Sequence, residues 1–316
     1  MTEYIFVDKD AKMRRGPEAQ RLLEQGSDSV YLSAASGITS VPEERWKLAQ
    51  AYEATTWMSE GAHATEDRNS AHRDNFDGYR ALQGMRFEHA IELGCGPFTN
   101  LRWIAAACRI ERCTLLDPLI ARYRSHRHCR YAGGWLRTEE KPLSRRLGKT
   151  VAHRALRRAI RALAPAWLND GVPVAKTIAA PIEELSPGQR YDLVVMINVI
   201  EHCYDLRRIL ATILDLLPDG GIFVFSDKYF DHDDVASFVR TYYDAGHPLR
   251  VDRRVLSEFM QRNFEPLYEK AVPVDERIAG ETTVHYDEFH FVGRKRRVAG
   301  EAAVTDAAPA AESGQA

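Results

Sequence analysis

Residues 90–101 combine an acid with two closely spaced glycines in a pattern that suits ligand binding through the backbone. They read AIELGCGPFTNL: an apolar run containing Glu92, a turn with Gly94 and Gly96, and the start of a helical pattern. Glycine lets the chain turn tightly and lets a ligand approach where a Cβ would intrude. An isolated Gly-x-Gly more often marks a plain strand-to-helix turn, so the neighbouring residues decide its chemistry.

Those neighbours separate two cofactor classes. A dinucleotide site needs Gly-x-Gly-x-x-Gly, but Thr99 stands at the third glycine position. Such a site also places a pyrophosphate over the helix N-terminus, where Glu92 is an unfavourable neighbour. S-adenosylmethionine (SAM) instead carries an ammonium and a sulfonium, which suit a carboxylate at the end of the strand. The turn therefore favours a cationic cofactor.

A second acid, Asp117, stands 21 residues after Gly96 in the sequence Leu-Leu-Asp-Pro. A carboxylate at the end of the second strand accepts hydrogen bonds from both ribose hydroxyls in NAD and in SAM sites. Asp-Pro also opens helices well, with the aspartate as N-cap. Spacing alone leaves both interpretations open.

The elements that position these acids alternate between strands and helices from Phe87 onward. Apolar runs at 90–93, 114–116, 193–197 and 222–225 predict strands, and amphipathic patterns at 101–108 and 206–217 predict helices. Strands separated by helices imply parallel βαβ units with ligands at the carboxyl ends of the strands. The runs 267–274 and 288–294 have no convincing helix between them, which predicts an antiparallel strand.

Three later motifs complete a series: APIEEL at 180–185, YDLVVMINVIEH at 191–202 and LPDGGIFVF at 217–225. Together with the glycine turn and Asp117, the series resembles the class I SAM-dependent methyltransferases in order and spacing over residues 87–294. The resemblance implies an α/β, Rossmann-like, seven-stranded, mostly parallel sheet in the order 3-2-1-4-5-7-6 with the last strand antiparallel. It also implies SAM as cofactor and S-adenosylhomocysteine (SAH) as product.

Carried over by position, the resemblance assigns the turn to the methionine part of SAM, the next acid to the ribose and the 182–183 segment to the adenine. Phe98 and Pro181 differ from the family pattern, in which many members have a glycine and an adenine-contacting acid. Arg73, before the core, is a further candidate contact, with a surface loop as the alternative. Besides Arg73, the cofactor-binding residues expected are Glu92, Gly94, Cys95, Gly96, Asp117, Pro118, Ile182, Glu183 and Asn198.

Asn198 and His202 are the candidate catalytic residues. With Glu201 they are spaced i, i+3, i+4, so a helix starting just after the fourth strand would place all three on one face. An imidazole can accept a proton from an attacking hydroxyl or amine. The alternative is that His202 hydrogen-bonds a neighbouring loop and only shapes the site.

A related Glu-x-x-Glu-His arrangement binds a divalent ion in the small-RNA 3′-terminal ribose methyltransferases. Here Asn198 replaces the first glutamate and forfeits a charged oxygen ligand, and only His232 would remain to complete such a site. The sequence therefore predicts no metal.

Three further segments flank or interrupt the core. Residues 1–80 predict an N-terminal helical cap whose capping box runs from Ser40 to Glu43, and residues 81–297 form the methyltransferase domain. A helical insertion at 131–174 carries nine Lys or Arg between Arg137 and Arg161, which most simply form the solvated face of a lid helix. The Ala-rich tail 298–316 is predicted to be disordered.

The amino-acid composition narrows the class of protein, its cellular compartment and its partners. The chain is 45% apolar and 28% charged, with a net charge of −2, which is typical of a globular protein and gives no general attraction to nucleic acid. Five cysteines without a Cys-x-x-Cys pair suggest a reduced, cytoplasmic compartment. No apolar run is long enough to span a bilayer and no signal peptide is apparent.

The sequence thus predicts a methyltransferase acting on an oxygen or nitrogen of a small molecule or glycan, of natural-product or cell-envelope type. One alternative is an RNA ribose 2′-O-methyltransferase, although nucleic acid is not the expected partner. Another is a catalytically inactive SAM-fold binding protein. The sequence identifies no acceptor and leaves a homodimer open.

Overall fold

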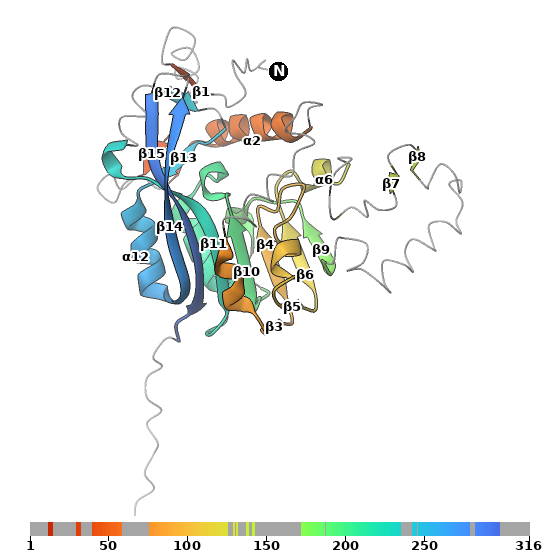
Figure 1. Ribbon diagram of the computed structural model, residues 1–316. Helices are drawn as coiled ribbons and strands as arrows, with labels where there is room; N and C mark the ends of the chain where they lie inside the picture. Colours follow the sequence, from red (N-terminus) through yellow and green to blue (C-terminus); the bar gives the residue numbers. More distant parts are fainter. Residues whose placement is uncertain are drawn as a thin grey trace, which may run out of the picture.

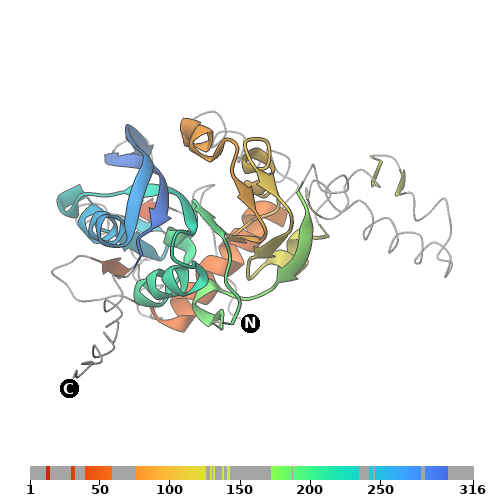
Figure 2. The same cartoon turned by 90° about the horizontal axis from the view of Figure 1, so that it is seen from below.

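The computed structural model shows a central sheet with helices packed on both faces (Figures 1 and 2). It describes residues 12–14, 30–32, 40–58, 76–125, 129, 131, 137–138, 141–142, 172–186, 188–234, 242–244, 246–278 and 282–297. Most of the predicted insertion 131–174 and the whole tail 298–316 lie outside these residues. Among the described helices, none is long and apolar enough to cross a membrane.

The sheet has seven strands in the order β14-β15-β11-β10-β4-β6-β9. Numbered as core strands, this is the predicted order 3-2-1-4-5-7-6, which is confirmed. The inner strands pair in parallel, and β15 runs antiparallel to both β11 and β14. The strands are β4 (Ala90–Leu93), β6 (Cys113–Leu116), β9 (Val174–Ile178), β10 (Leu193–Ile197), β11 (Ile222–Tyr229), β14 (Phe264–Ile278) and β15 (Thr282–Lys295).

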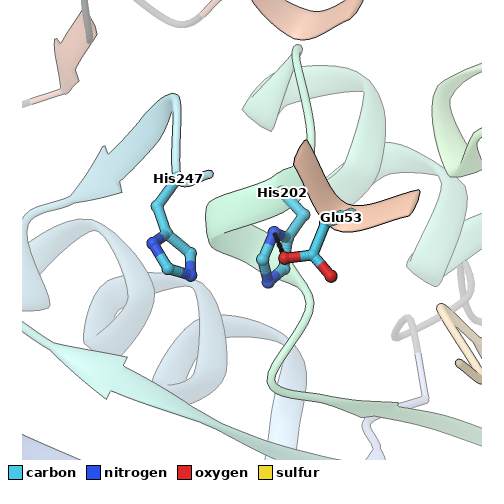
Figure 3. A group of neighbouring side chains, drawn as sticks. All are labelled: Glu53, His202 and His247. Atoms are coloured by element: carbon cyan, nitrogen blue, oxygen red, sulfur yellow. Dashed lines mark ion pairs between the residues drawn. The ribbon is translucent and has the colours of Figure 1, made fainter. Parts of the chain in front are cut away.

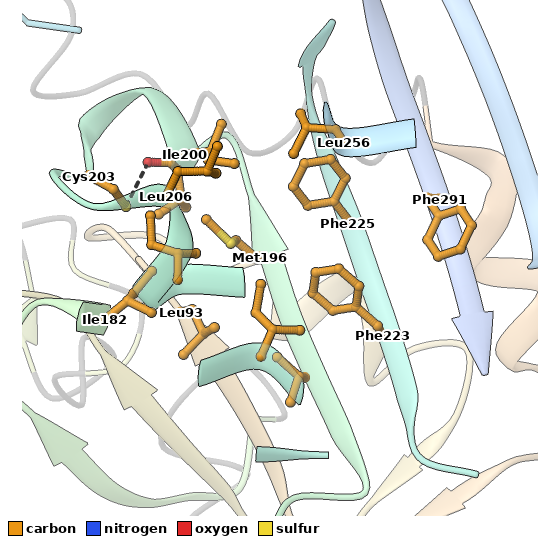
Figure 4. Close-up of a cluster of buried hydrophobic side chains, with 14 of the residues drawn as sticks. Leu93, Ile182, Met196, Ile200, Cys203, Leu206, Phe223, Phe225, Leu256 and Phe291 are labelled. Carbon is orange, nitrogen blue, oxygen red and sulfur yellow. Dashed lines mark hydrogen bonds between the residues drawn. The ribbon is translucent and has the colours of Figure 1, made fainter. Parts of the chain in front are cut away.

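The inner strands are apolar along their whole length because both of their faces are covered. Every residue of β4, β6 and β10 is buried. One face carries Met196, Phe223 and Phe225, which pack with Leu256 and Phe291 (Figure 4). The opposite face carries a second buried cluster built around other residues of the same strands.

The helices connect the strands and cover the sheet. Asp205 caps α10 by accepting from the backbone N–H of Arg208, and the buried side of that helix faces the core. The helix α12, which precedes β14, was not predicted from the sequence. The α-helices are α2 (Glu43–Met58), α5 (Leu101–Ile104), α6 (Ile120–Tyr123), α10 (Leu206–Leu216) and α12 (Arg253–Asn263), and the 3₁₀ helices are η1 (Asp77–Leu82), η3 (Ile182–Glu184) and η4 (Ile200–His202).

In the part of the chain that the structure describes, four small two-stranded sheets lie outside the central one, and none was predicted. Two of them bring N-terminal strands to the segment between β11 and β14. The pairs are β1 (Lys12–Arg14) with β12 (Tyr242–Asp244), β2 (Val30–Leu32) with β13 (Leu249–Val251), β3 (Arg86–Phe87) with β5 (Arg109–Ile110), and β7 (Arg137–Thr138) with β8 (Lys141–Pro142).

Two local predictions need correction. The helix α2 begins at Glu43 rather than directly after Ser40, because Ser40 forms a β-bridge with Asp205 instead of an N-cap. The helix predicted over 101–108 ends at Ile104 and continues as turns. Figure 1 shows α2 lying above the end of the sheet, where it can cover a site formed by the strand ends.

Candidate active site

One pocket lies where the parallel strands end and is walled by α2. It holds about 1250 Å³ of empty space, part of it open to solvent, which is ample for a nucleoside cofactor together with a small acceptor. The residues that line it are Trp46, Gln50, Tyr52, Glu53, Thr56, Trp57, Gly94, Cys95, Gly96, Pro97, Asn100, Asp117, Pro118, Leu119, Tyr123, Pro181, Ile182, Glu183, Ile197, Asn198, Val199, His202, Cys203 and His247.

The glycine turn lines this pocket through its backbone. Gly94 has a φ of +68°, and a Cβ there would stand 2.5 Å from the side chain of Val199. Gly96 has a φ of +52° but open space on its Cβ side. Both positions require the left-handed region that glycine adopts without strain, and at Gly94 the close approach of Val199 adds a second requirement.

Asp117 lines the pocket and also holds the turn in place. Its Oδ2 accepts from the Gly96 N–H at 3.1 Å and its Oδ1 from the Leu119 N–H at 2.7 Å. Asp117 therefore caps the next turn, as one interpretation of the sequence expected, and it also faces the cavity. Burial raises the pKa of Asp117 to about 7, against the opposing effect of those two N–H donors.

Glu92, which was expected to hold the methionine part of SAM, does not line the pocket with the other expected residues. Its side chain is fully buried beneath the turn. The carboxyl accepts from the Thr99 hydroxyl and from the backbone N–H of Asn100 at 2.7 Å. Burial raises the pKa of Glu92 to about 7. Glu92 therefore fixes the path of the loop that follows the turn.

The other positions expected to contact the cofactor do line the pocket: Cys95, Pro118, Ile182 and Glu183. The Oε1 of Glu183 accepts from two consecutive backbone N–H groups, of which the Tyr204 N–H is 2.6 Å away. Its carboxylate therefore also fastens the loop before α10.

The predicted helical face of Asn198, Glu201 and His202 is wrong. Asn198 precedes the 3₁₀ helix η4 and has a φ of +55°, a region that asparagine tolerates better than most residues. Glu201 is buried and points away from the pocket, where it pairs with Lys228 and Arg250. Asn198 and His202 both line the pocket.

His202 has three neighbours at the end of the pocket. Its Nδ1 lies 3.1 Å from the Gly246 carbonyl oxygen and 3.4 Å from Glu53 Oε1, and its ring packs at 4.7 Å from that of His247. Burial lowers the pKa of His202, and Glu53 partly opposes this effect. The imidazole is therefore neutral near pH 7.

Sequence reasoning missed Glu53, His247 and the other residues that α2 contributes. Nothing in the spacing of positions 53, 202 and 247 indicates that they meet, because the contact depends on how α2 crosses the sheet. Arg73 and most of the basic residues between Arg137 and Arg161 lie outside the described residues. His232 is described and does not line this pocket.

The charge of the pocket suits a cation. Among the described residues that line it, three carry carboxyl groups (Glu53, Asp117 and Glu183) and none is a lysine or arginine. A pyrophosphate would meet these acids without a compensating cation, whereas the sulfonium and ammonium of SAM would be attracted. The charges of the residues that line the pocket therefore suit SAM, although Glu92 is not among these residues.

Residues 66–271 match the model of a family described as a methyltransferase domain. The chain belongs to this family. It is a SAM-dependent methyltransferase, as the resemblance in the sequence predicted. No curated protein matches the chain.

Solved structures similar to this methyltransferase include the N-methyltransferase NodS from Bradyrhizobium japonicum in complex with SAH. It is 16% identical, with a TM-score of 0.46, and the match covers 79% of this chain and 99% of that one. A 1,6-didemethyltoxoflavin-N1-methyltransferase from Burkholderia thailandensis is also 16% identical, with a TM-score of 0.43 over 85% of this chain and 100% of that one.

Proposed function

We propose that this methyltransferase acts on an oxygen or nitrogen atom of a small molecule or glycan. The observation that carries the proposal is that a single pocket contains both sets of expected residues. The glycine turn, Asp117 and Ile182 line it together with Asn198 and His202. Cofactor and acceptor can therefore meet inside one cavity that α2 covers.

The cofactor roles follow from the placement of the lining groups. When bound, SAM supplies a methyl group on a positively charged sulfur. Gly94, Cys95 and Gly96 would receive the methionine part through their backbone, and the oxygens of Asp117 keep acceptor sites for the ribose hydroxyls. Ile182 and Glu183, with Pro118, would border the adenine. Asn198 would line the space between the two ligands.

The acceptor side is aromatic, with a polar end. Trp46, Tyr52 and Trp57 of α2 line the pocket, and rings of this kind pack well against planar or apolar molecules. The polar end carries Glu53 and His202. Holding the acceptor atom in line with the methyl group would contribute on the order of 7–11 kcal/mol to the reaction.

We assign activation of the acceptor to His202. A carbonyl oxygen only accepts hydrogen bonds, so the Nδ1 of His202 carries the proton toward the Gly246 carbonyl. Its Nε2 then has a lone pair. That lone pair can take the acceptor's proton directly, or it can bind a cation that makes the proton easier to lose.

Product formation tests this proposal. The full chain is incubated with SAM and a panel of small hydroxyl and amine compounds and glycans, and SAH release is measured. We expect SAH with at least one small acceptor and its loss in His202→Ala. SAH formed with RNA alone would support ribose methylation instead, and SAM binding without product from any acceptor would indicate a binding protein.

A further inference from the structure

Glu53, His202 and His247 form a cluster whose ligand-type atoms all lie within 4.8 Å of one another. Figure 3 shows the three side chains converging from different parts of the chain. Glu53 belongs to α2, His202 to η4, and His247 precedes β13. All three line the pocket assigned to the reaction. Their side chains are 15–19% exposed, so a ligand from the pocket can reach them.

Both imidazoles are oriented by a hydrogen bond at Nδ1. The Nδ1 of His247 lies 3.1 Å from both carboxylate oxygens of Asp244, which is buried and ion-paired with Arg250. The Nδ1 of His202 faces the Gly246 carbonyl. Carboxylate and carbonyl oxygens accept, so each Nδ1 is the donor in these bonds, and in the neutral ring the lone pair is on Nε2. Histidines that bind metals are usually held in this way.

Glu53 is oriented in the same manner. Its Oε2 accepts from the indole N–H of Trp57 at 2.7 Å, and its Oε1 lies 3.4 Å from His202 Nδ1, the nitrogen that also faces the Gly246 carbonyl. Each of the three side chains therefore uses one polar atom on a neighbour and presents another to the cluster.

The three supporting segments are also tied to one another. The carbonyl oxygen of His202 accepts from Trp46 Nε1 at 3.1 Å and from Gln50 Nε2 at 3.2 Å, which joins η4 to α2. The buried side chain of Arg45 donates to the backbone carbonyl of Asp244, which joins α2 to the His247 segment. Hydrogen bonds thus hold the three segments that carry the cluster together, as a binding site with fixed geometry requires.

We propose that Glu53, His202 and His247 bind a divalent transition-metal ion, for which Zn²⁺ is the probe. Two imidazoles with one carboxylate favour transition ions over Mg²⁺ and Ca²⁺. Three protein ligands leave at least one coordination position open, as in catalytic zinc sites. Because all three residues line the pocket, a molecule in the pocket could reach an ion held by them. The site was not predicted from the sequence, whose only metal candidates were Asn198, Glu201, His202 and His232.

This inference rests on the proposed function, and it narrows the acceptor to a hydroxyl compound. A hydroxyl oxygen bound at the open position would lose its proton to water at a lower pH than in solution, because the cation stabilises the resulting anion. No electron is transferred and no further reagent is needed. His202 would then act on the acceptor through the ion.

The test titrates the full chain, freed of metal by a chelator, with Zn²⁺ in a calorimeter. We expect one strong site per chain, and at least tenfold weaker binding in Glu53→Gln and in His247→Asn. Trp57→Phe, which removes only the outer donor to Glu53, should weaken binding by about tenfold or less. Co²⁺ should give a visible absorption band that His247→Asn abolishes.

His285→Asn is the matched control, since His285 also pairs with a carboxylate, Asp275 at 2.7 Å, but is exposed on β15. It should bind Zn²⁺ like the parent chain. Equal Zn²⁺ binding in parent and cluster variants, or no strong site at all, overturns the proposal. The proposed function is tested separately. If SAM binding and SAH release persist in the presence of the chelator, the proposed function stands. If SAM does not bind, that function is contradicted, but the Zn²⁺ titration is unaffected.

Discussion

At the residue scale, the two glycines of the cofactor turn have different reasons to be glycine. Gly94 combines a positive φ with a Cβ position only 2.5 Å from Val199, whereas a Cβ at Gly96 would meet nothing within 4 Å. The sequence shows both as the same Gly-x-Gly and cannot separate them, because the difference depends on a side chain more than a hundred residues away.

We predict that Gly94→Ala is much more destabilising than Gly96→Ala. Each alanine accepts about 1–2 kcal/mol of left-handed backbone strain, and Gly94→Ala adds about 1–3 kcal/mol of overpacking against Val199. Urea unfolding monitored by fluorescence gives the two free energies. Equal losses at both positions would show that Val199 does not restrict the turn.

Asp117 gives a prediction for pH dependence. Burial raises the pKa of its carboxyl from 3.8 to about 7, so the group gains its charge only as pH rises through that value in the folded protein. Ribose hydroxyls donate best to the charged form. SAM affinity should therefore fall as pH is lowered from about 8 to 6.

Asp117→Asn is the companion variant, and calorimetry at several pH values is the measurement. It should bind SAM at least tenfold more weakly than the parent at pH 8, with a flat profile across this range. A parent profile that is equally flat would contradict the assignment of Asp117 to the ribose.

At the element scale, buried ion pairs connect η4 to the segments around it. Arg250 of β13 is buried and contacts Glu201 of η4 and Asp244 of β12. Removing its charge takes one partner from each of two buried carboxylates, although Glu201 keeps Lys228 and Asp244 keeps His247. Arg250→Ala should therefore lower the free energy of unfolding by about 3–5 kcal/mol.

Arg254→Ala is the control for that change, because Arg254 pairs with Asp252 while remaining 67% exposed. Because the Arg254 guanidinium is exposed to water, its pair with the buried Asp252 should contribute about 1 kcal/mol or less. Thermal or urea unfolding distinguishes the two variants. A loss of about 1 kcal/mol or less in Arg250→Ala would mean that this network does not hold η4 in place.

The central strands could be predicted from sequence because each is a short apolar run bounded by turn residues. Residues 90–93 and 193–197 are strands over their full predicted length. The helical face predicted for Asn198, Glu201 and His202 was wrong, because a positive φ at Asn198 breaks the helical periodicity on which the prediction was based. The small outer sheets escaped prediction because their strands are only two or three residues long, and two of the pairs join N-terminal residues to the segment between β11 and β14.

At the scale of the whole molecule, the pocket residues that directly follow a strand could be predicted from the sequence. The pocket residues that come from outside the sheet could not. Asp117 and Asn198 follow strands, and the carboxyl ends of parallel strands lie at one edge. Glu53 and His247 reach the same pocket through α2 and the segment before β13. Their meeting is set by tertiary packing, which hydrophobic periodicity alone does not encode.

The central claim is that this acidic pocket takes a cationic nucleoside rather than a pyrophosphate. Calorimetric titration of the full chain with SAM and, separately, with NAD⁺ tests it most directly. The account predicts saturable heat with SAM at one site per chain and none with NAD⁺ at the same concentrations. Saturable NAD⁺ binding, with no heat from SAM at millimolar concentration, would contradict it.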